Sequence, residues 1–174
     1  VVSSKVHDNI KAAAKFVFDN AVRSVESLDS LRAKALSIIG LYHYYKKYKH
    51  ADILDKARTL ADCLVHAYDA NSSGEWEWFE PYLTYSNSKL PESLFLAYLM
   101  TKNEKYLEIA KKTIDFLLNT LIVDGKLVLI GNKGWYHKDN ERALYDQQPV
   151  DATSMVQTLL IAYKITKKKS YYSN

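Results

Sequence analysis

The stretch Leu94-Phe95-Leu96-Ala97-Tyr98-Leu99-Met100-Thr101-Lys102 decides the fold, because related stretches occur on both sides of it. Shifts of 53 and 65 positions bring identical residues into register: Leu41 with Leu94 and Leu159, Tyr45 with Tyr98 and Tyr163, Lys49 with Lys102, Thr101 with Thr166, Asp62 with Asp115, and Tyr106 with Tyr171. Self-similarity at a long period is typical of repeat architectures. The repeated unit is an apolar helix that ends near a tyrosine, a tight polar turn and a second helix. The third copy stops soon after its second helix begins.

The hydrophobic pattern predicts the same helices. Apolar residues recur at helical spacing over about 5–22, 31–48, 51–69, 94–100, 104–120 and 150–166. Asp124-Gly125 is a strong turn signal, and residues 126–130 predict a short strand, so we expect a strand or short β-hairpin near 126–136. The predicted fold class is therefore all-α, with residues 1–174 forming a single helical domain of repeated hairpins.

Long links join the repeated units, over about 70–90 and 121–149, whereas the turns inside each unit are short. In a helix-hairpin repeat the long links lie on one face, and loops on a rigid scaffold are where a site is built. The spacing of the units exceeds the ~34 residues of a tetratricopeptide repeat and the ~40–47 residues of a HEAT repeat. We therefore expect hairpins that form part of an α/α toroid. An open helical solenoid that binds protein is the alternative.

The composition excludes several classes of protein. With 48% hydrophobic residues the chain is not disordered, and five Gly and three Pro argue against a turn-rich all-β fold. Cys63 is the single cysteine, which excludes an internal disulfide and a Cys-based zinc site, and we expect it to be a small buried hydrophobic residue. No run approaches the roughly 18 apolar residues of a membrane span.

The charge and the motifs of the sequence also limit which partners and cofactors we expect. A net charge of +4 is mild, and we interpret the cluster of Lys164, Lys167, Lys168 and Lys169 as a solvated turn, with no nucleic acid bound. The five histidines are scattered without metal-ligand spacing, and no Gly-rich phosphate loop occurs, so we expect no metal and no cofactor. The first residues lack the apolar segment of a signal peptide, and we expect a cytoplasmic location.

The first long link concentrates acids and aromatic rings, with Glu75, Trp76, Glu77, Trp78, Phe79, Glu80, Tyr82 and Tyr85 close together. Aromatic faces stack on the apolar faces of sugar rings, and carboxylates and amides bind sugar hydroxyls. The alternative is that Trp76, Trp78 and Phe79 plug the end of the helical bundle while the acids face water. The second long link repeats the mixture with Trp135, Tyr136, Tyr145, Asp146, Gln147 and Gln148.

Two carboxyl groups are what glycoside hydrolysis generally needs, one as the proton donor and one as the base or nucleophile. Glu80 and Asp146 come from different long links on one predicted face, so we expect them to form this pair, with Glu75, Glu77, Glu92 and Asp151 as substitutes. Pro149 predicts the first turn of the last helix, and Asp151 would lie in that turn. The helix dipole also favours a carboxylate there, which is a competing explanation for Asp151.

Several motifs resemble one superfamily in order and spacing. They are residues 76–80, 83–87, 90–94, 130–135 and 146–152, which read WEWFE, LTYSN, LPESL, IGNKGW and DQQPVDA. Over residues 30–174 the chain resembles the six-hairpin glycosidase-like, (α/α)6-toroid superfamily, in particular the helical domains beside or fused to sugar transferases and mannoside-processing proteins. The resemblance implies a carbohydrate-related role and these site candidates: Trp78, Glu80, Asn87, Asn132, Trp135, Asp146, Gln147, Gln148 and Asp151.

Three hypotheses follow. The first is a glycoside hydrolase-like domain, with Glu80 and Asp146 as the acid/base pair, Trp78 and Trp135 as sugar platforms, and Asn132, Gln147 and Gln148 as hydroxyl binders. The second is a non-catalytic glycan-binding or scaffold domain that accompanies a glycosyltransferase, and the third is a protein-binding solenoid. Because a full toroid holds six hairpins, the resemblance also implies a fragment of about half a ring. Its open edge would be covered by the remainder of the chain or by a second subunit.

Overall fold

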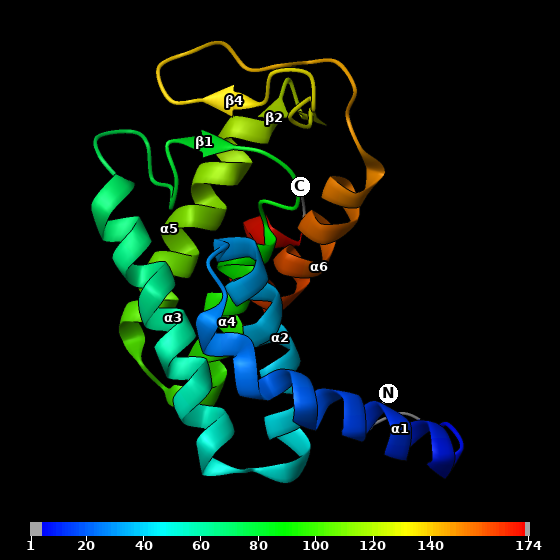
Figure 1. Cartoon of the computed structure of the whole chain (residues 1–174). Helices are drawn as coiled ribbons and strands as arrows, with labels where there is room; N and C mark the ends of the chain where they lie inside the picture. Colours follow the sequence, from blue (N-terminus) through cyan, green and yellow to red (C-terminus); the bar gives the residue numbers. More distant parts are fainter. Residues whose placement is uncertain (1–4, 173–174) are drawn as a thin grey trace.

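The computed structural model describes residues 5–172, which are mostly helical with two small antiparallel strand pairs (Figure 1). The elements in order are α1 (Asp8–Ala21), the 3-10 helix η1 (Val22–Ser27), α2 (Leu31–Tyr48), α3 (Ala51–Asn71), β1 (Tyr82–Leu83), α4 (Lys89–Thr101), α5 (Glu104–Leu121), β2 (Ile122–Val123), β3 (Lys126–Leu127), β4 (Tyr136–His137), α6 (Pro149–Thr166) and the 3-10 helix η2 (Lys169–Tyr171). Helices of this length and number make the all-α prediction correct at the level of class.

The repeated stretches end their helices in the same way. α2, α4 and α6 each stop at a lysine in the left-handed conformation, at φ 55°, 60° and 60°, and the lysine N–H bonds the carbonyl of the tyrosine four residues earlier. Each lysine Nζ also lies over that tyrosine ring, at 4.8 Å for Lys49 on Tyr45, 5.5 Å for Lys102 on Tyr98 and 5.9 Å for Lys167 on Tyr163. A cation over an aromatic face is attracted by the ring quadrupole. The internal repeat is therefore a repeat of structure as well as of sequence.

A second repeated contact joins one unit to the next. The Tyr106 hydroxyl of α5 donates to Asp62 of α3 at 2.6 Å, and the Tyr171 hydroxyl of η2 donates to Asp115 of α5 at 2.9 Å. The shift of 53 positions aligns Asp62 with Asp115, and the shift of 65 positions aligns Tyr106 with Tyr171. The two contacts are therefore equivalent. The pKa of each tyrosine is raised, first by burial and then by its aspartate.

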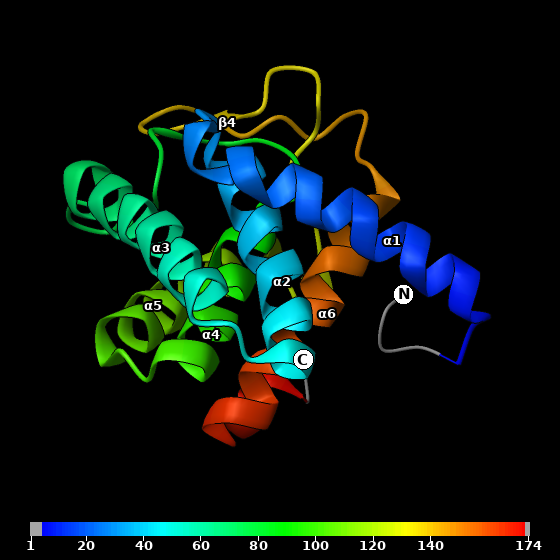
Figure 2. The ribbon, with the colours of Figure 1, turned by 60° about the horizontal axis from the view of Figure 1, so that its bottom comes forward.

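The first helices of the units form one layer. α2 packs against α4 and α4 against α6, while α3 and α5 cover the outer side of α2 and α4 (Figures 1 and 2). The core lies between the layers and consists of residues with almost no exposure, among them Ile38, Leu60, Leu64, Leu94, Phe95, Ile109 and Leu117. α1 buries no side chain, exposes Ile10, Phe16 and Val17, and extends away from the layers in Figure 2. None of the helices in residues 5–172 has the length and apolar character that crossing a bilayer requires.

Three details differ from the sequence-based expectations. α4 begins at Lys89, not near residue 94, because Pro91 falls in the first turn, where its missing N–H has no cost. The β-hairpin consists of β2 and β3, and it turns at Asp124 and Gly125, two residues with positive φ. Residues 128–130, which we expected to continue the strand, are not a strand. Cys63 is half-buried, not buried, because it lies at the edge of the apolar stripe of α3.

The long links gather at one end of the molecule, as the repeat predicts. β1, β2 and β4 all lie at the top of Figure 1, at the end of the molecule where α5 finishes and α6 begins. β1 pairs with β4, with Tyr82 opposite His137 and Leu83 opposite Tyr136, so the two long links are tied to each other. We call this end the loop face.

Candidate functional site

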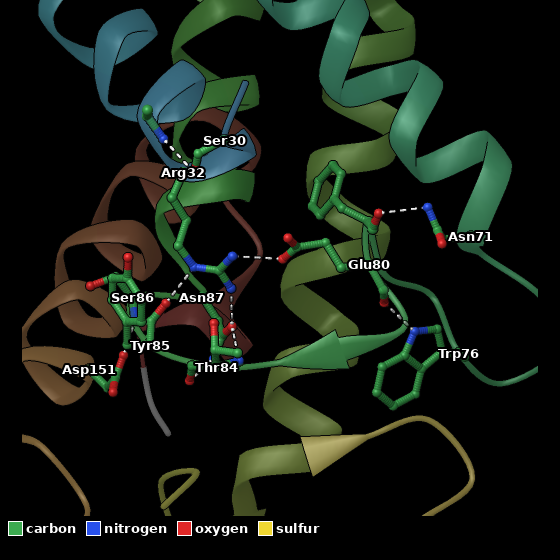
Figure 3. Close-up of polar contacts among 12 residues, drawn as sticks. Ser30, Arg32, Asn71, Trp76, Glu80, Thr84, Tyr85, Ser86, Asn87 and Asp151 are labelled. Carbon is green, nitrogen blue, oxygen red and sulfur yellow. Dashed lines mark hydrogen bonds and ion pairs between the residues drawn. The ribbon is translucent and has the colours of Figure 1, made fainter. Parts of the chain in front are cut away.

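Arg32, in the first turn of α2, holds the first long link in place. Its guanidinium donates three hydrogen bonds, from Nη1 to Glu80 Oε2 at 2.7 Å, from Nε to the Tyr85 carbonyl at 2.8 Å, and from Nη2 to Asn87 Oδ1 at 3.1 Å (Figure 3). The residue is only 8% exposed. A buried guanidinium needs such partners, because an unpaired buried charge is costly. Arg32 therefore fixes the positions of Glu80 and Tyr85 relative to α2.

Asn87 closes the same turn. Its Oδ1 also accepts from the Thr84 N–H at 3.0 Å, and its Nδ2 donates to the Thr84 carbonyl at 2.9 Å. The residue is buried. We expected Asn87 to bind substrate, but the structure places it under the loop, where it clamps residues 84–87.

Asp151 ties the loop to the third unit. It lies in the first turn of α6, as predicted, and its buried carboxylate accepts a hydrogen bond from the Ser86 N–H (Figure 3). Burial raises the pKa of Asp151, and the Ser86 N–H and the charge of Arg32 offset part of that effect. Arg32 and Asp151 thus hold the loop from α2 and from α6.

The loop face contains a cavity of about 650 Å³ above these anchors. We call it the loop-face cavity. Its lining includes two carboxyl residues, one guanidinium, one imidazole and three large aromatic rings, contributed by Asp29, Glu80, Arg32, His137, Tyr82, Tyr85 and Trp135. Both long links and the start of α2 therefore contribute to one concave surface.

The aromatic rings of this cavity are arranged around Tyr85, which is 50% exposed. The Tyr85 ring lies 6.2 Å from the Trp135 ring at 45°, and the Arg32 guanidinium lies 5.3 Å from its centroid. The negative charge of Glu80, followed by burial, raises the pKa of the Tyr82 hydroxyl. A hydrogen bond from the Tyr82 hydroxyl to the Glu80 side chain also raises this pKa, so the single proton of the hydroxyl already has an acceptor.

The tryptophans of the first link do not reach this cavity. Trp78 has 0% exposure, and Trp76 and Phe79 are also buried. Trp76 packs edge-on against Phe116 and Tyr136 and donates from Nε1 to the Glu80 carbonyl at 2.8 Å. The expectation that Trp78 is a sugar platform is corrected, because a ring without exposed surface cannot stack on a ligand. These residues plug the end of the bundle, which was the alternative reading.

The second link uses its polar residues mainly on itself. Gln147 accepts from the Leu129 N–H at 3.2 Å and donates to the Leu144 carbonyl at 2.9 Å. The carbonyl of Asp146 accepts from the Asn132 N–H at 3.2 Å. Gln148 is the exposed N-cap residue of α6 and makes no side-chain cap bond, and Asn132 is half-buried. Of the predicted site residues in this link, Trp135 alone lines the loop-face cavity.

The predicted acid/base pair is not brought together in this cavity. Glu80 lines it, whereas Asp146 is exposed elsewhere on the second link and Asp151 is buried below it. The second carboxylate of the cavity is Asp29, which precedes α2. Sequence reasoning missed Asp29 and Arg32. A basic residue in the first turn of a helix is disfavoured by the helix dipole, and this was the available signal for Arg32.

A larger hollow lies on the other side of the β1–β4 ribbon. It has a volume of about 1060 Å³ and is lined by Glu75, Trp76, Phe116, Tyr136, Lys138 and Arg142, among others. Because successive strand residues point to opposite faces, Tyr136 lines this outer hollow while His137 lines the loop-face cavity. Within residues 5–172, no group of three or more His, Cys, Asp or Glu side chains is arranged to hold a metal ion.

Comparisons with known proteins gave no match, whether with protein-family models, with curated proteins or with solved structures.

Proposed function

We propose that the loop-face cavity binds a carbohydrate. The observation that carries the proposal is the combination of half-exposed aromatic rings with fixed polar groups in one cavity, namely Tyr85 and Trp135 beside Glu80 and Arg32. Rings with an exposed face stack on sugars, and a carboxylate held in place accepts hydrogen bonds from sugar hydroxyls. The fixed anchors lower the entropy cost of ordering the site on binding.

In this proposal Tyr85 and Trp135 are the stacking surfaces, and Glu80, Tyr82 and His137 orient the sugar. The Tyr82 hydroxyl donates to Glu80, and its oxygen can accept a hydrogen bond from a sugar hydroxyl. The resemblance to six-hairpin glycosidase-like domains supports the same ligand class. It also supports the further proposals that the three units are part of an α/α toroid and that the domain accompanies a glycosyltransferase.

Binding to a panel of oligosaccharides that includes mannosides tests the proposal. Calorimetry on the best-bound member should give a weaker affinity for Tyr85→Ala by about tenfold or more, which corresponds to about 1.4 kcal/mol. Tyr145→Ala is the matched control, because Tyr145 is 80% exposed in the second link and is not among the residues that line the loop-face cavity. Equal affinities of the two variants would contradict the proposal.

Glycoside hydrolysis is a second candidate function. The observation that favours it is that two carboxyl residues, Asp29 and Glu80, line the same cavity. Hydrolysis in most glycosidase families needs two such groups. The oligosaccharides bound in the calorimetric screen are incubated with the protein, and released sugars are measured by chromatography. A hydrolase would lose turnover in both Asp29→Asn and Glu80→Gln, whereas a binding module would release no sugar at all.

A further inference from the structure

A second, much smaller cavity lies below the loop face, between the starts of α4 and α6. Its volume is about 10 Å³, and its apolar walls come from Leu121, Leu129 and Met155. Three polar residues complete the lining: Asn87, Ser88 at the N-cap of α4 and Asp151 in the first turn of α6. The cavity is therefore placed at the joint between the second and third repeated units.

The side chains of Ser88 and Asp151 each have an unpaired atom. Within residues 5–172, Ser88 Oγ and Asp151 Oδ2 are buried and have no hydrogen-bond partner. The side chains are also more than nine-tenths buried as residues, at 3% and 8% exposure. Buried polar atoms are nearly always hydrogen-bonded, since leaving one unpaired carries its full desolvation cost. Two such atoms in one cavity indicate a shared partner.

We infer that this cavity is a binding site for one water molecule, which accepts a hydrogen bond from the Ser88 hydroxyl and donates one to Asp151 Oδ2. The size fits, because a space of ~10–15 Å³ holds a single water molecule. The chemistry fits as well, because a buried water needs more than one polar partner, and the residues that line this cavity carry a buried, unpaired hydroxyl and a buried, unpaired carboxylate oxygen. Of the remaining lining residues only Asn87 is polar, and its side-chain amide already bonds Arg32 and both backbone groups of Thr84.

The water site gives Asp151 a positioning role. Its Oδ1 accepts from the Ser86 N–H, and its Oδ2 takes the water that is bound to Ser88. The carboxylate thereby holds both ends of the segment 86–88, which follows Tyr85 directly in the chain. This part of the inference rests on the proposed function, because the residue that is positioned belongs to the proposed sugar site.

A high-resolution crystal structure of the protein tests the water site independently of any ligand. We expect one ordered water within hydrogen-bond distance of both Ser88 Oγ and Asp151 Oδ2. A direct bond between the two side chains, or a cavity that has collapsed, would overturn the inference. So would a cation with shorter, more numerous oxygen contacts.

Two variants separate the water from general packing. Ser88→Ala removes one partner, and we expect the water density to be lost and the thermal midpoint to fall. Ser93→Ala is the matched control, because Ser93 is also buried in the first half of α4 but bonds the Leu90 carbonyl of its own helix. The water should persist in Ser93→Ala, and its loss there would contradict the assignment.

The positioning role has its own readout. In Asp151→Asn the amide can accept from Ser86 through oxygen and donate to the water through nitrogen, so the water and the sugar affinity should both persist. In Asp151→Ala both contacts are lost, and the sugar affinity should fall while that of Tyr145→Ala does not. If the water is seen and no carbohydrate binds, the proposed function fails and the water site stands. If carbohydrate binds and the cavity holds no water, the water site fails and the proposed function stands.

Discussion

Replacing Arg32 with alanine should be among the most destabilising single changes in this chain. The substitution removes the donors for Glu80 Oε2, the Tyr85 carbonyl and Asn87 Oδ1 at once. The Arg32 and Glu80 side chains are only 10% and 13% exposed, so water replaces the lost partner poorly. Removing one partner of a buried ion pair costs about 3–5 kcal/mol, because the other charge stays buried without compensation.

The lower end of that range is the better value here. Glu80 lines the loop-face cavity, and water entering the cavity can reach its carboxylate after the substitution. We therefore expect a loss of about 3 kcal/mol, which is a large part of the ~5–15 kcal/mol that stabilises a typical domain.

Urea denaturation followed by far-ultraviolet circular dichroism measures this loss. Arg58→Ala is the control, because Arg58 pairs with Asp55 at 2.9 Å while the two side chains are 48% and 69% exposed. Exposed pairs of this kind contribute about 0–1 kcal/mol. If Arg32→Ala costs no more than Arg58→Ala, the reasoning that makes Arg32 the anchor of the loop face is refuted.

Three further predictions concern other parts of the fold. A Cβ at Gly131 would lie 2.0 Å from the Tyr145 carbonyl oxygen, so Gly131→Ala should cost about 3 kcal/mol in urea denaturation, and an unchanged midpoint would contradict the close approach of the two segments. Because the pKa of Asp151 is raised in the folded protein, its contribution to stability is fully present below the unfolded pKa and is lost as the pH rises through the folded pKa. The stability of Asp151→Asn relative to the unsubstituted protein should therefore increase from acid toward neutral pH, and a parallel pH profile would contradict the burial effect. Tyr106→Phe should lower stability by about 1 kcal/mol, because it removes the hydrogen bond between a buried tyrosine and Asp62, whose exposed carboxylate water can then hydrate. An unchanged midpoint in thermal unfolding would contradict this role of the pair.

The repeat could be predicted from the sequence because each helix end depends on residues that are close together in the chain. A tyrosine followed four residues later by a lysine marks each place where a first helix ends, and the structure confirms the same left-handed lysine at Lys49, Lys102 and Lys167. The position of Asp151 in the first turn of α6 was likewise readable, because Pro149 fixes the helix start. Contacts of this kind depend on residues a few positions apart.

The interior of the loop face was less readable, because it depends on contacts between distant residues. Trp78 and Trp135 look alike in the sequence, each beside polar residues in a long link, yet one is buried under the loop and the other lines the cavity. Arg32 meets residues about fifty positions away in the chain, and nothing in its own surroundings specifies them. Helical periodicity carries no information on such pairings, which are decided by how the units pack.

The three tryptophan indoles offer the most direct test of the central claim, that the loop-face cavity is the carbohydrate site. In a nitrogen–proton correlation spectrum each indole N–H gives its own signal, and Trp135 is the one that lines the cavity, while Trp76 and Trp78 are buried. Titration with the best-bound oligosaccharide should shift the Trp135 signal progressively, together with the backbone signals of Tyr85 and His137. Binding that leaves Trp135 unchanged would contradict the account, as would shifts confined to Arg142 and its neighbours around the outer hollow.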